Sequence, residues 1–145
     1  PDTIPWDTKA AGLYMICTLS KHEAEKQGYT DSLMLDHEGY VAEATGANIF
    51  FKDKDGNLHT PTPDCFLDGI TRRTVIEIAK SKNIKVNERK IKPEELSNFI
   101  GCFLTGTAAE VTPVSQIDKF NFKVCSTIID LSESYQSMVR KKKAA

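Results

Sequence analysis

Short apolar runs, each followed by turn residues, dominate the first half of the chain. Runs of this length and composition predict strands at 32–36, 40–43, 48–52 and 58–61. The first two form a hairpin, because the residues between them, which include Gly39, have turn chemistry. A second tight turn that contains Gly56 separates the last two strands.

Longer segments carry apolar residues at helical spacing. The pattern predicts a helix within 8–28 that ends at Gly28, a helix from Gly69 to about 81, and a helix over 126–139. In the last two helices, we expect the apolar positions to face the core. These positions are Ile70, Thr74, Val75, Ile76, Ile78 and Ala79 in the first, and Ile128, Ile129, Leu131, Tyr135 and Met138 or Val139 in the second.

The remaining segments complete a mixed pattern. Strands are predicted at 84–88, 101–105 and 111–117, and a short helix at 92–96 has Pro93 near its start. Strands dominate the first half and helices are interspersed. The fold class is therefore α/β, with a mixed, largely antiparallel sheet and packed helices.

Charge and hydropathy narrow the classes of function. The chain has 145 residues, 19 Lys and Arg against 20 Asp and Glu, and a formal charge of −1, which argues against a nucleic-acid partner. A basic run at 140–143 is interpreted as a solvated tail. No apolar run is long enough for a membrane span and no signal peptide is recognisable, so we expect a cytoplasmic protein with no membrane partner.

Cysteine and histidine spacing predicts no metal site. The cysteines have no CxxC spacing and are expected to be buried free thiols: Cys17, Cys65, Cys102 and Cys125. His22-Glu23 begins like a zinc-protease helix, but Lys26 stands where the second histidine is required.

Three local features could carry chemistry, each with a structural alternative. The helix that starts after Gly69 has no acidic residue in its first turn and could bind an anion, or Asp68 could simply cap it. Small residues at 106–109 follow a buried strand and could admit a ligand to backbone amides, or form a close-packed turn. Glu43, among small residues, could face a cationic ligand nitrogen or be a surface acid.

Taken together and in order, these segments resemble the class IV pyridoxal-phosphate aminotransferases, and most closely the branched-chain amino acid aminotransferases. The resemblance covers about 9–117. The matching motifs are KAAGLY at 9–14, DHEGYVAEATGANIF at 36–50, TPTP at 60–63, LDGITR at 67–72 and GTAAEVTPV at 106–114. One departure is Leu13, where many branched-chain members carry Asn.

The resemblance implies roles for individual residues. Lys9 matches the catalytic lysine that binds the aldehyde of pyridoxal 5'-phosphate and then moves the substrate proton. Glu43 matches the acid that pairs with the ring nitrogen, and Tyr14 the tyrosine that hydrogen-bonds the ring oxygen. The remaining matches hold the phosphate (Gly69, Ile70, Thr71 and Thr107) and receive the substrate carboxylate (Thr107 and Ala108).

The resemblance also implies a domain plan and a reaction. Residues 1–8 would be the remnant of an interdomain linker and 9–145 the cofactor-binding large domain, with the family's N-terminal small domain absent. The implied reaction transfers amino groups between branched-chain L-amino acids and 2-oxoglutarate, in a homo-oligomer of full-length chains. The isolated fragment is expected to be inactive, because part of the site would be missing.

Two other functions stay open from the sequence. Related enzymes of the same fold, the D-amino-acid aminotransferases and aminodeoxychorismate lyases, keep the same lysine and glutamate and differ mainly in their pockets. A non-catalytic anion-binding or interaction module would keep the helix start without using Lys9.

Overall fold

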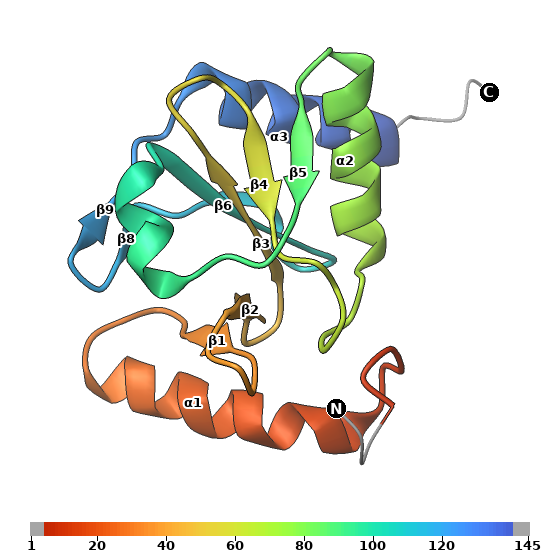
Figure 1. Ribbon diagram of the computed structural model, residues 1–145. Helices are drawn as coiled ribbons and strands as arrows, with labels where there is room; N and C mark the ends of the chain where they lie inside the picture. The colour runs from red at the N-terminus through yellow and green to blue at the C-terminus, as the bar shows by residue number, and fades with distance from the viewer. Residues whose placement is uncertain (1–4, 141–145) are drawn as a thin grey trace.

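A five-stranded sheet lies at the centre of the computed structural model, which describes residues 5–140 (Figure 1). Its strand order is β5-β4-β3-β6-β7, in which β4 and β5 run parallel and the other neighbours antiparallel. The strands are β3 (Asn48–Lys52), β4 (Leu58–Thr60), β5 (Val86–Glu88), β6 (Gly101–Gly106) and β7 (Glu110–Pro113). The predicted mixed, mainly antiparallel sheet is confirmed.

Apolar clusters cover both faces of this sheet. On one face, helices α2 (Ile70–Ser81) and α3 (Ser126–Val139) pack on Phe50 and Phe103, whose rings stack with centroids 4.9 Å apart. On the other face, Phe51 stacks on Phe99, which follows the 3-10 helix η2 (Pro93–Asn98). Burial on both faces explains why β3 and β6 are almost continuously apolar rather than alternating.

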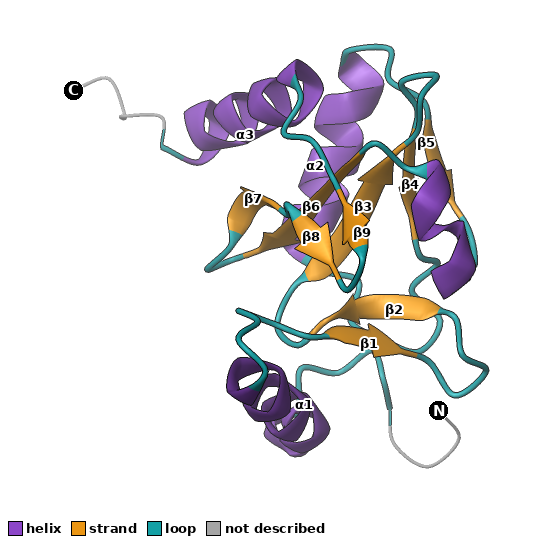
Figure 2. Ribbon diagram, turned by 90° about the vertical axis from the view of Figure 1, so that its left-hand side faces the viewer, coloured by secondary structure: helices purple, strands orange, loops and turns teal. Residues whose placement is uncertain are grey.

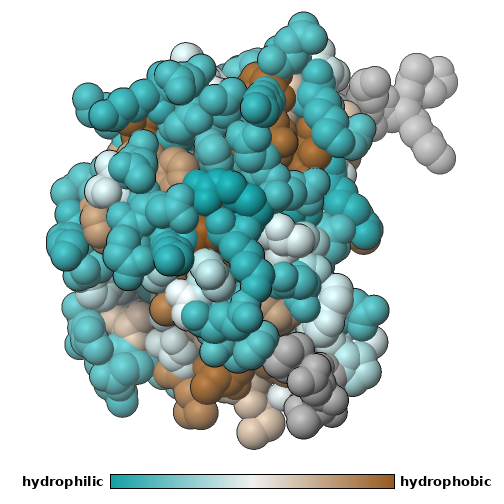
Figure 3. All heavy atoms as spheres, in the orientation of Figure 1, coloured by the Kyte–Doolittle hydropathy of each residue, from teal (hydrophilic) through white to brown (hydrophobic). Residues whose placement is uncertain are grey.

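A separate layer lies against one end of the sheet. It consists of the hairpin β1 (Leu33–Leu35) and β2 (Val41–Ala44) together with helix α1 (Tyr14–Lys26), which follows the 3-10 turn η1 (Ala11–Leu13) (Figures 1 and 2). Helix α1 has no buried residue, and Met15, Ile16 and Leu19 are each more than 60% exposed. Figure 3 shows apolar side chains at the lower edge, where α1 lies.

Several element predictions are wrong in detail. The strand expected at 111–117 is divided into β7 and a short β8 (Gln116–Ile117), which pairs with β9 (Phe120–Asn121), a strand that the pattern did not predict. Four positions expected in the core are exposed: Ile70, Ile129, Met138 and Val139. The apolar stripe of each helix is narrower than expected, because each helix contacts the core along only one side.

The two predicted glycine positions are confirmed. Gly28 follows α1 with φ +85°, a conformation that favours glycine, and Gly56 has φ +91° in the predicted turn. All four cysteines are free, although only Cys102 is fully buried. None of the described helices is long and apolar enough to cross a membrane. The basic tail lies mostly at 141–145, outside the described residues.

The stacked Phe50–Phe103 pair gives a stability prediction. Phe103→Ala should lower the free energy of unfolding by about 3–5 kcal/mol, because it leaves a cavity between the sheet and two helices. Urea denaturation measures the change. Met138→Ala, at a position 52% exposed on α3, is the control and should change stability by less than about 0.5 kcal/mol. Equal effects of the two substitutions would contradict this packing.

Candidate functional site

Two turns that contain residues of the sequence motifs, 45–47 and 107–109, lie at one end of the central sheet. Strand β3 begins at Asn48, which is paired with Thr105 near the end of β6. The turn before β3 and the turn after β6 are therefore neighbours: a Cβ built on Gly106 would lie 3.4 Å from the carbonyl oxygen of Gly46. The sequence-predicted residues Glu43 and Thr107 lie on or next to these two turns.

Glu43 lies at this end of the sheet, and its surroundings raise its pKa. It is half-buried on β2 and lines a cavity of about 300 Å³ together with Tyr14, Cys17 and Cys65. Burial raises the pKa of Glu43 to about 7, while the positive charge of Lys9 acts in the opposite direction. Burial makes the ionised form of Glu43 unfavourable. A cationic hydrogen-bond donor would stabilise that form, so the site suits a ligand group of this kind.

Lys9 lies close to both Tyr14 and Glu43. Its side chain is exposed, and its Nζ lies 5.8 Å from the centre of the Tyr14 ring. The turn η1 begins at Ala11 and α1 at Tyr14, so ordered structure follows Lys9 closely while its amine is exposed to a ligand. The structure thus brings together three of the predicted residues, Lys9, Tyr14 and Glu43.

The start of α2 is open, as an anion site requires. Gly69 is the N-cap, no side chain caps the helix, and its first turn contains no acid. The alternative that Asp68 caps this helix is wrong, since Asp68 instead accepts a hydrogen bond from Arg72 at 2.8 Å. Ile70 is exposed, whereas the Thr71 hydroxyl is buried and lies 3.3 Å from the Tyr135 hydroxyl.

Arg72 fixes the loop that leads into α2. Its side chain is 1% exposed and donates to Asp68, to Glu88 on β5 at 2.7 Å and to the carbonyl oxygen of Pro61 at 3.0 Å. This guanidinium points into the protein, so it is not the charge that receives an anion at the helix start. Its role is to hold the loop before α2 against the sheet.

The turn after β6 offers polar groups to a ligand. Thr107 and Ala108 are exposed there, so their backbone groups are accessible. Thr105, just before them, is fully buried, and its Oγ1 has no hydrogen-bond partner among the residues that the structure describes. Because Thr105 is opposite Asn48, both side chains emerge on the sheet face that carries α2. A buried, unpaired hydroxyl near an uncapped helix start fits a site for an anionic ligand group.

Sequence reasoning missed Asn48, Thr105 and Arg72 as site residues. Each is a polar side chain that the structure buries at 5% exposure or less. The available signal was that Asn48 and Thr105 flank apolar strand segments, where polar residues need partners. Nothing in the sequence alone said which residues those partners would be.

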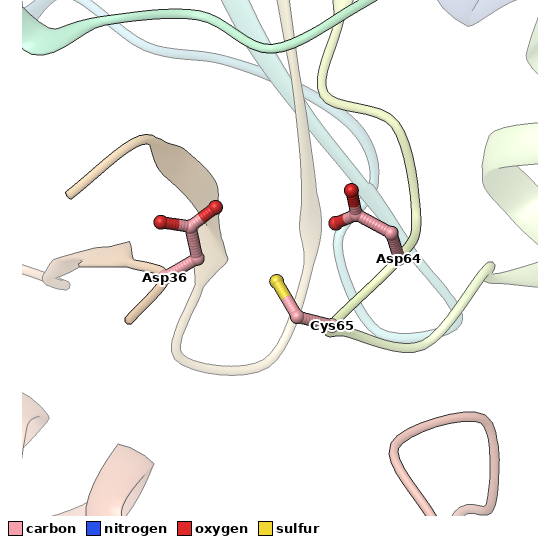
Figure 4. Close-up of side chains that lie close together, drawn as sticks. All are labelled: Asp36, Asp64 and Cys65. Carbon is pink, nitrogen blue, oxygen red and sulfur yellow. The ribbon is translucent and has the colours of Figure 1, made fainter. Parts of the chain in front are cut away.

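A second cluster lies at the rim of the cavity. Asp36, Asp64 and Cys65 point toward one another, and their potential ligand atoms lie within 4.8 Å (Figure 4). However, Asp36 already accepts backbone N–H groups of Glu38 and Tyr40, and burial with nearby carboxylates raises the pKa of Cys65 to about 12. Metal binding requires a thiolate, so the cluster is better explained by the turn that Asp36 stabilises.

A larger groove than this cavity lies elsewhere on the described surface. It has a volume of about 840 Å³ and runs between the second half of α1 and the segment 112–118. It contains none of Lys9, Tyr14, Glu43 and the start of α2. Groove size therefore does not locate the candidate site, which is identified by its polar groups.

Comparisons with known proteins point to one family. The model of the family described as amino-transferase class IV matches residues 5–117. A probable branched-chain-amino-acid aminotransferase of Rickettsia felis is 51% identical over 124 residues, which are 86% of this chain and 42% of that protein. The branched-chain-amino-acid aminotransferase of Escherichia coli is 42% identical over 119 residues, 81% of this chain and 38% of that protein.

Solved structures agree with these sequence matches. The branched-chain aminotransferase of Thermoproteus uzoniensis, solved with norvaline, has a TM-score of 0.90 and 38% identity, over 95% of this chain and 46% of that one. The branched-chain amino acid aminotransferase of Thermobaculum terrenum, solved in its PLP-form, has a TM-score of 0.90 and 36% identity, over 95% of this chain and 46% of that one. The present chain thus spans about half the length of the relatives that it matches.

The raised pKa of Glu43 gives a pH prediction for the ligand-free chain. Folding raises this pKa from 4.5 to about 7, so the folded state binds more protons in that interval. The associated stability is fully present below about pH 4.5 and is lost as the pH rises through about 7. Glu43→Gln should therefore lose less stability over this interval than the parent chain does.

Urea denaturation between these two pH values measures the difference. Glu77→Gln, at an exposed acid on α2, is the control and should follow the parent curve. Parallel curves for Glu43→Gln and the parent would show that Glu43 keeps an ordinary pKa.

Proposed function

The chain belongs to the class IV aminotransferase family, and we propose that it is the cofactor-binding half of an enzyme that transfers amino groups between branched-chain L-amino acids and 2-oxoglutarate. The relatives with this name are about twice as long. The proposal includes residues 9–145 as the large domain and 1–8 as a linker. We further propose that the sequence acts within a longer chain, in the cytoplasm and as a homo-oligomer.

The proposed cofactor is pyridoxal 5'-phosphate. Family neighbours were solved with cofactor groups: the Thermobaculum terrenum structure is the PLP-form, and another branched-chain aminotransferase was solved with pyridoxamine 5'-phosphate. The residues of this chain fit such a group: a free amine at Lys9, a half-buried acid at Glu43 and an uncapped helix start near an unpaired Thr105 hydroxyl. When bound, the cofactor supplies an aldehyde and an aromatic ring that withdraws electrons from the reacting carbon.

The chain's own groups then have distinct tasks. With the cofactor bound, Lys9 would supply the amine that holds its aldehyde, and the same amine would take a proton from the substrate carbon. Tyr14 donates a hydrogen bond to the ring oxygen. The Glu43 carboxylate accepts a hydrogen bond from the ring nitrogen and holds a proton there, which lets the ring withdraw electrons. A cationic partner would favour the charged form of Glu43 and lower its pKa from about 7.

Backbone groups would hold the two anionic ends. The amides of Ile70 and Thr71, with the helix dipole of α2, bind the phosphate, and Thr107 adds a second contact. Amides of Thr107 and Ala108 receive the substrate carboxylate and orient the reacting carbon toward Lys9. The observation that supports this proposal best is that Tyr14 and Glu43 line one cavity, while Lys9 lies over the Tyr14 ring and acts on Glu43 as a positive charge.

Two alternatives make different predictions. A D-amino-acid aminotransferase or an aminodeoxychorismate lyase would use the same Lys9 and Glu43 with another substrate pocket. A non-catalytic module would bind an anion at α2 without a covalent bond to Lys9. The names of the matched relatives favour the branched-chain reaction over these alternatives.

Trapping the cofactor tests the role of Lys9. After incubation with pyridoxal 5'-phosphate and borohydride, mass spectrometry of peptides should find the adduct on Lys9, because reduction makes the bond between amine and aldehyde permanent. Lys9→Arg should abolish this adduct, whereas Lys26→Arg, at an exposed lysine of α1, should leave it intact. Labelling spread over surface lysines, equal in all three proteins, would favour the non-catalytic module.

Substrate tests separate the related enzymes. The chain alone should turn over L-leucine with 2-oxoglutarate at least about 100-fold more slowly than the Escherichia coli relative, because catalysis tolerates little misplacement of groups. A full-length protein that contains this sequence should form 4-methyl-2-oxopentanoate from L-leucine. Turnover of D-alanine, or pyruvate release from aminodeoxychorismate, would instead identify one of the alternatives.

A further inference from the structure

One buried amide connects the two ends of the proposed cofactor site. The Asn48 side chain is 5% exposed, and its Nδ2 donates to Glu43 Oε2 at 3.2 Å and to the carbonyl oxygen of Leu67 at 2.8 Å. Its Oδ1 accepts the N–H of Gly69 at 3.2 Å. Both amide hydrogens and the carbonyl oxygen therefore have partners, on β2 and on the segment that opens α2.

The contact with this amide explains why position 69 is glycine. Its backbone angles, φ −62° and ψ 144°, are open to any residue, so no turn conformation demands glycine here. A Cβ at position 69 would, however, lie 2.4 Å from Asn48 Oδ1, well inside contact distance. Only a residue without a side chain lets Asn48 reach the backbone at the start of α2.

We propose that Asn48 is a positioning residue, which holds the Glu43 carboxylate and the N-terminus of α2 as one unit. This inference rests on the proposed function, in which Glu43 binds the ring nitrogen and α2 binds the phosphate. Asn48 then fixes the separation of the two groups before the cofactor arrives. Pre-organisation of this kind increases affinity, because neither group has to be immobilised on binding.

Asn48 is an uncharged hydrogen-bond donor to the Glu43 carboxylate, and other groups nearby act on that carboxylate through their charge. Lys9 acts on the carboxylate as a positive charge. The thiols of Cys17 and Cys65 face the same cavity, and burial together with nearby carboxylates raises the pKa of both. At neutral pH both thiols are uncharged. Loss of the Asn48 amide would therefore remove a hydrogen bond that favours the ionised acid.

The test uses three substitutions in the complete chain and one control. Asn48→Ala removes the amide, and Gly69→Ala keeps the amide but displaces it through the close contact. The double variant carries both substitutions. The Cβ of its alanine at position 69 has no Asn48 oxygen to clash with, because position 48 is also alanine. Asn57→Ala is the matched control, because Asn57 also donates to a carboxylate, Asp53 at 2.9 Å, in the turn at the opposite end of β3.

Two quantities are measured on samples that circular dichroism shows to be folded. Fluorescence titration gives the affinity for pyridoxal 5'-phosphate, and carbon-13 NMR of the Glu43 carboxyl gives its pKa without cofactor. Asn48→Ala and Gly69→Ala should each weaken the affinity about tenfold or more, as expected when a hydrogen bond to a charged group is lost. Both should raise the pKa of Glu43, and Asn57→Ala should change neither quantity.

The double variant distinguishes positioning from general destabilisation. Its affinity should equal that of Asn48→Ala alone, because both substitutions break the same connection. Effects that add in the double variant, or a pKa of Glu43 that is unchanged in Asn48→Ala, would overturn the inference. A merely structural role would lower stability without moving this pKa.

Failure of the proposed function gives a different result. If a full-length protein that contains this sequence binds no pyridoxal 5'-phosphate, the proposed function fails, and the carboxyl titration of the cofactor-free chain decides the role of Asn48. A raised pKa in Asn48→Ala and Gly69→Ala supports Asn48 as the group that holds Glu43, and an unchanged pKa overturns it.

Discussion

The antiparallel pairing of β3 with β6 organises the sheet, the apolar clusters on its two faces and the candidate site. The paired residues run from Asn48 opposite Thr105 to Lys52 opposite Gly101, without a bulge. Within this pairing, Phe50 and Phe103 stack under the helices, while Phe51 packs into the cluster on the other face. A one-residue slip would exchange the two faces, so the core fixes the register. The same register sets the two turns of the candidate site side by side.

The buried polar groups near the site differ in how many hydrogen bonds they make. Arg72 donates to side chains and backbone on three sides, and Asn48 uses all of its amide groups. Thr105 Oγ1 lacks a partner among residues 5–140. Since unpaired buried groups are unfavourable, the fully paired side chains form the frame of the site, and the unpaired hydroxyl marks where a ligand group fits.

The second layer explains how a small chain exposes both Lys9 and an apolar surface. Helix α1 rests on the β1–β2 hairpin rather than on the central sheet, and none of its residues is buried (Figure 2). Lys9 precedes η1 and α1 in the chain and lies near Tyr14 and the acid on β2. The exposed residues Met15, Ile16 and Leu19 fit the proposal that the sequence works within a longer, oligomeric chain.

The amino-acid pattern alone was enough to predict the local structure and the family. Apolar periodicity predicted most elements near their observed bounds, since β3 and α2 depend on local patterning, and the ordered motifs from Lys9 to Val114 carried the resemblance. The partners of the side chains, in contrast, depend on how the chain packs in three dimensions. It turned Asp68 toward Arg72 instead of the start of α2, left Ile70 exposed and joined Asn48 to Glu43 and Gly69. These contacts join residues up to 21 positions apart, and a local pattern contains no information about which distant groups the packed core brings within hydrogen-bonding distance.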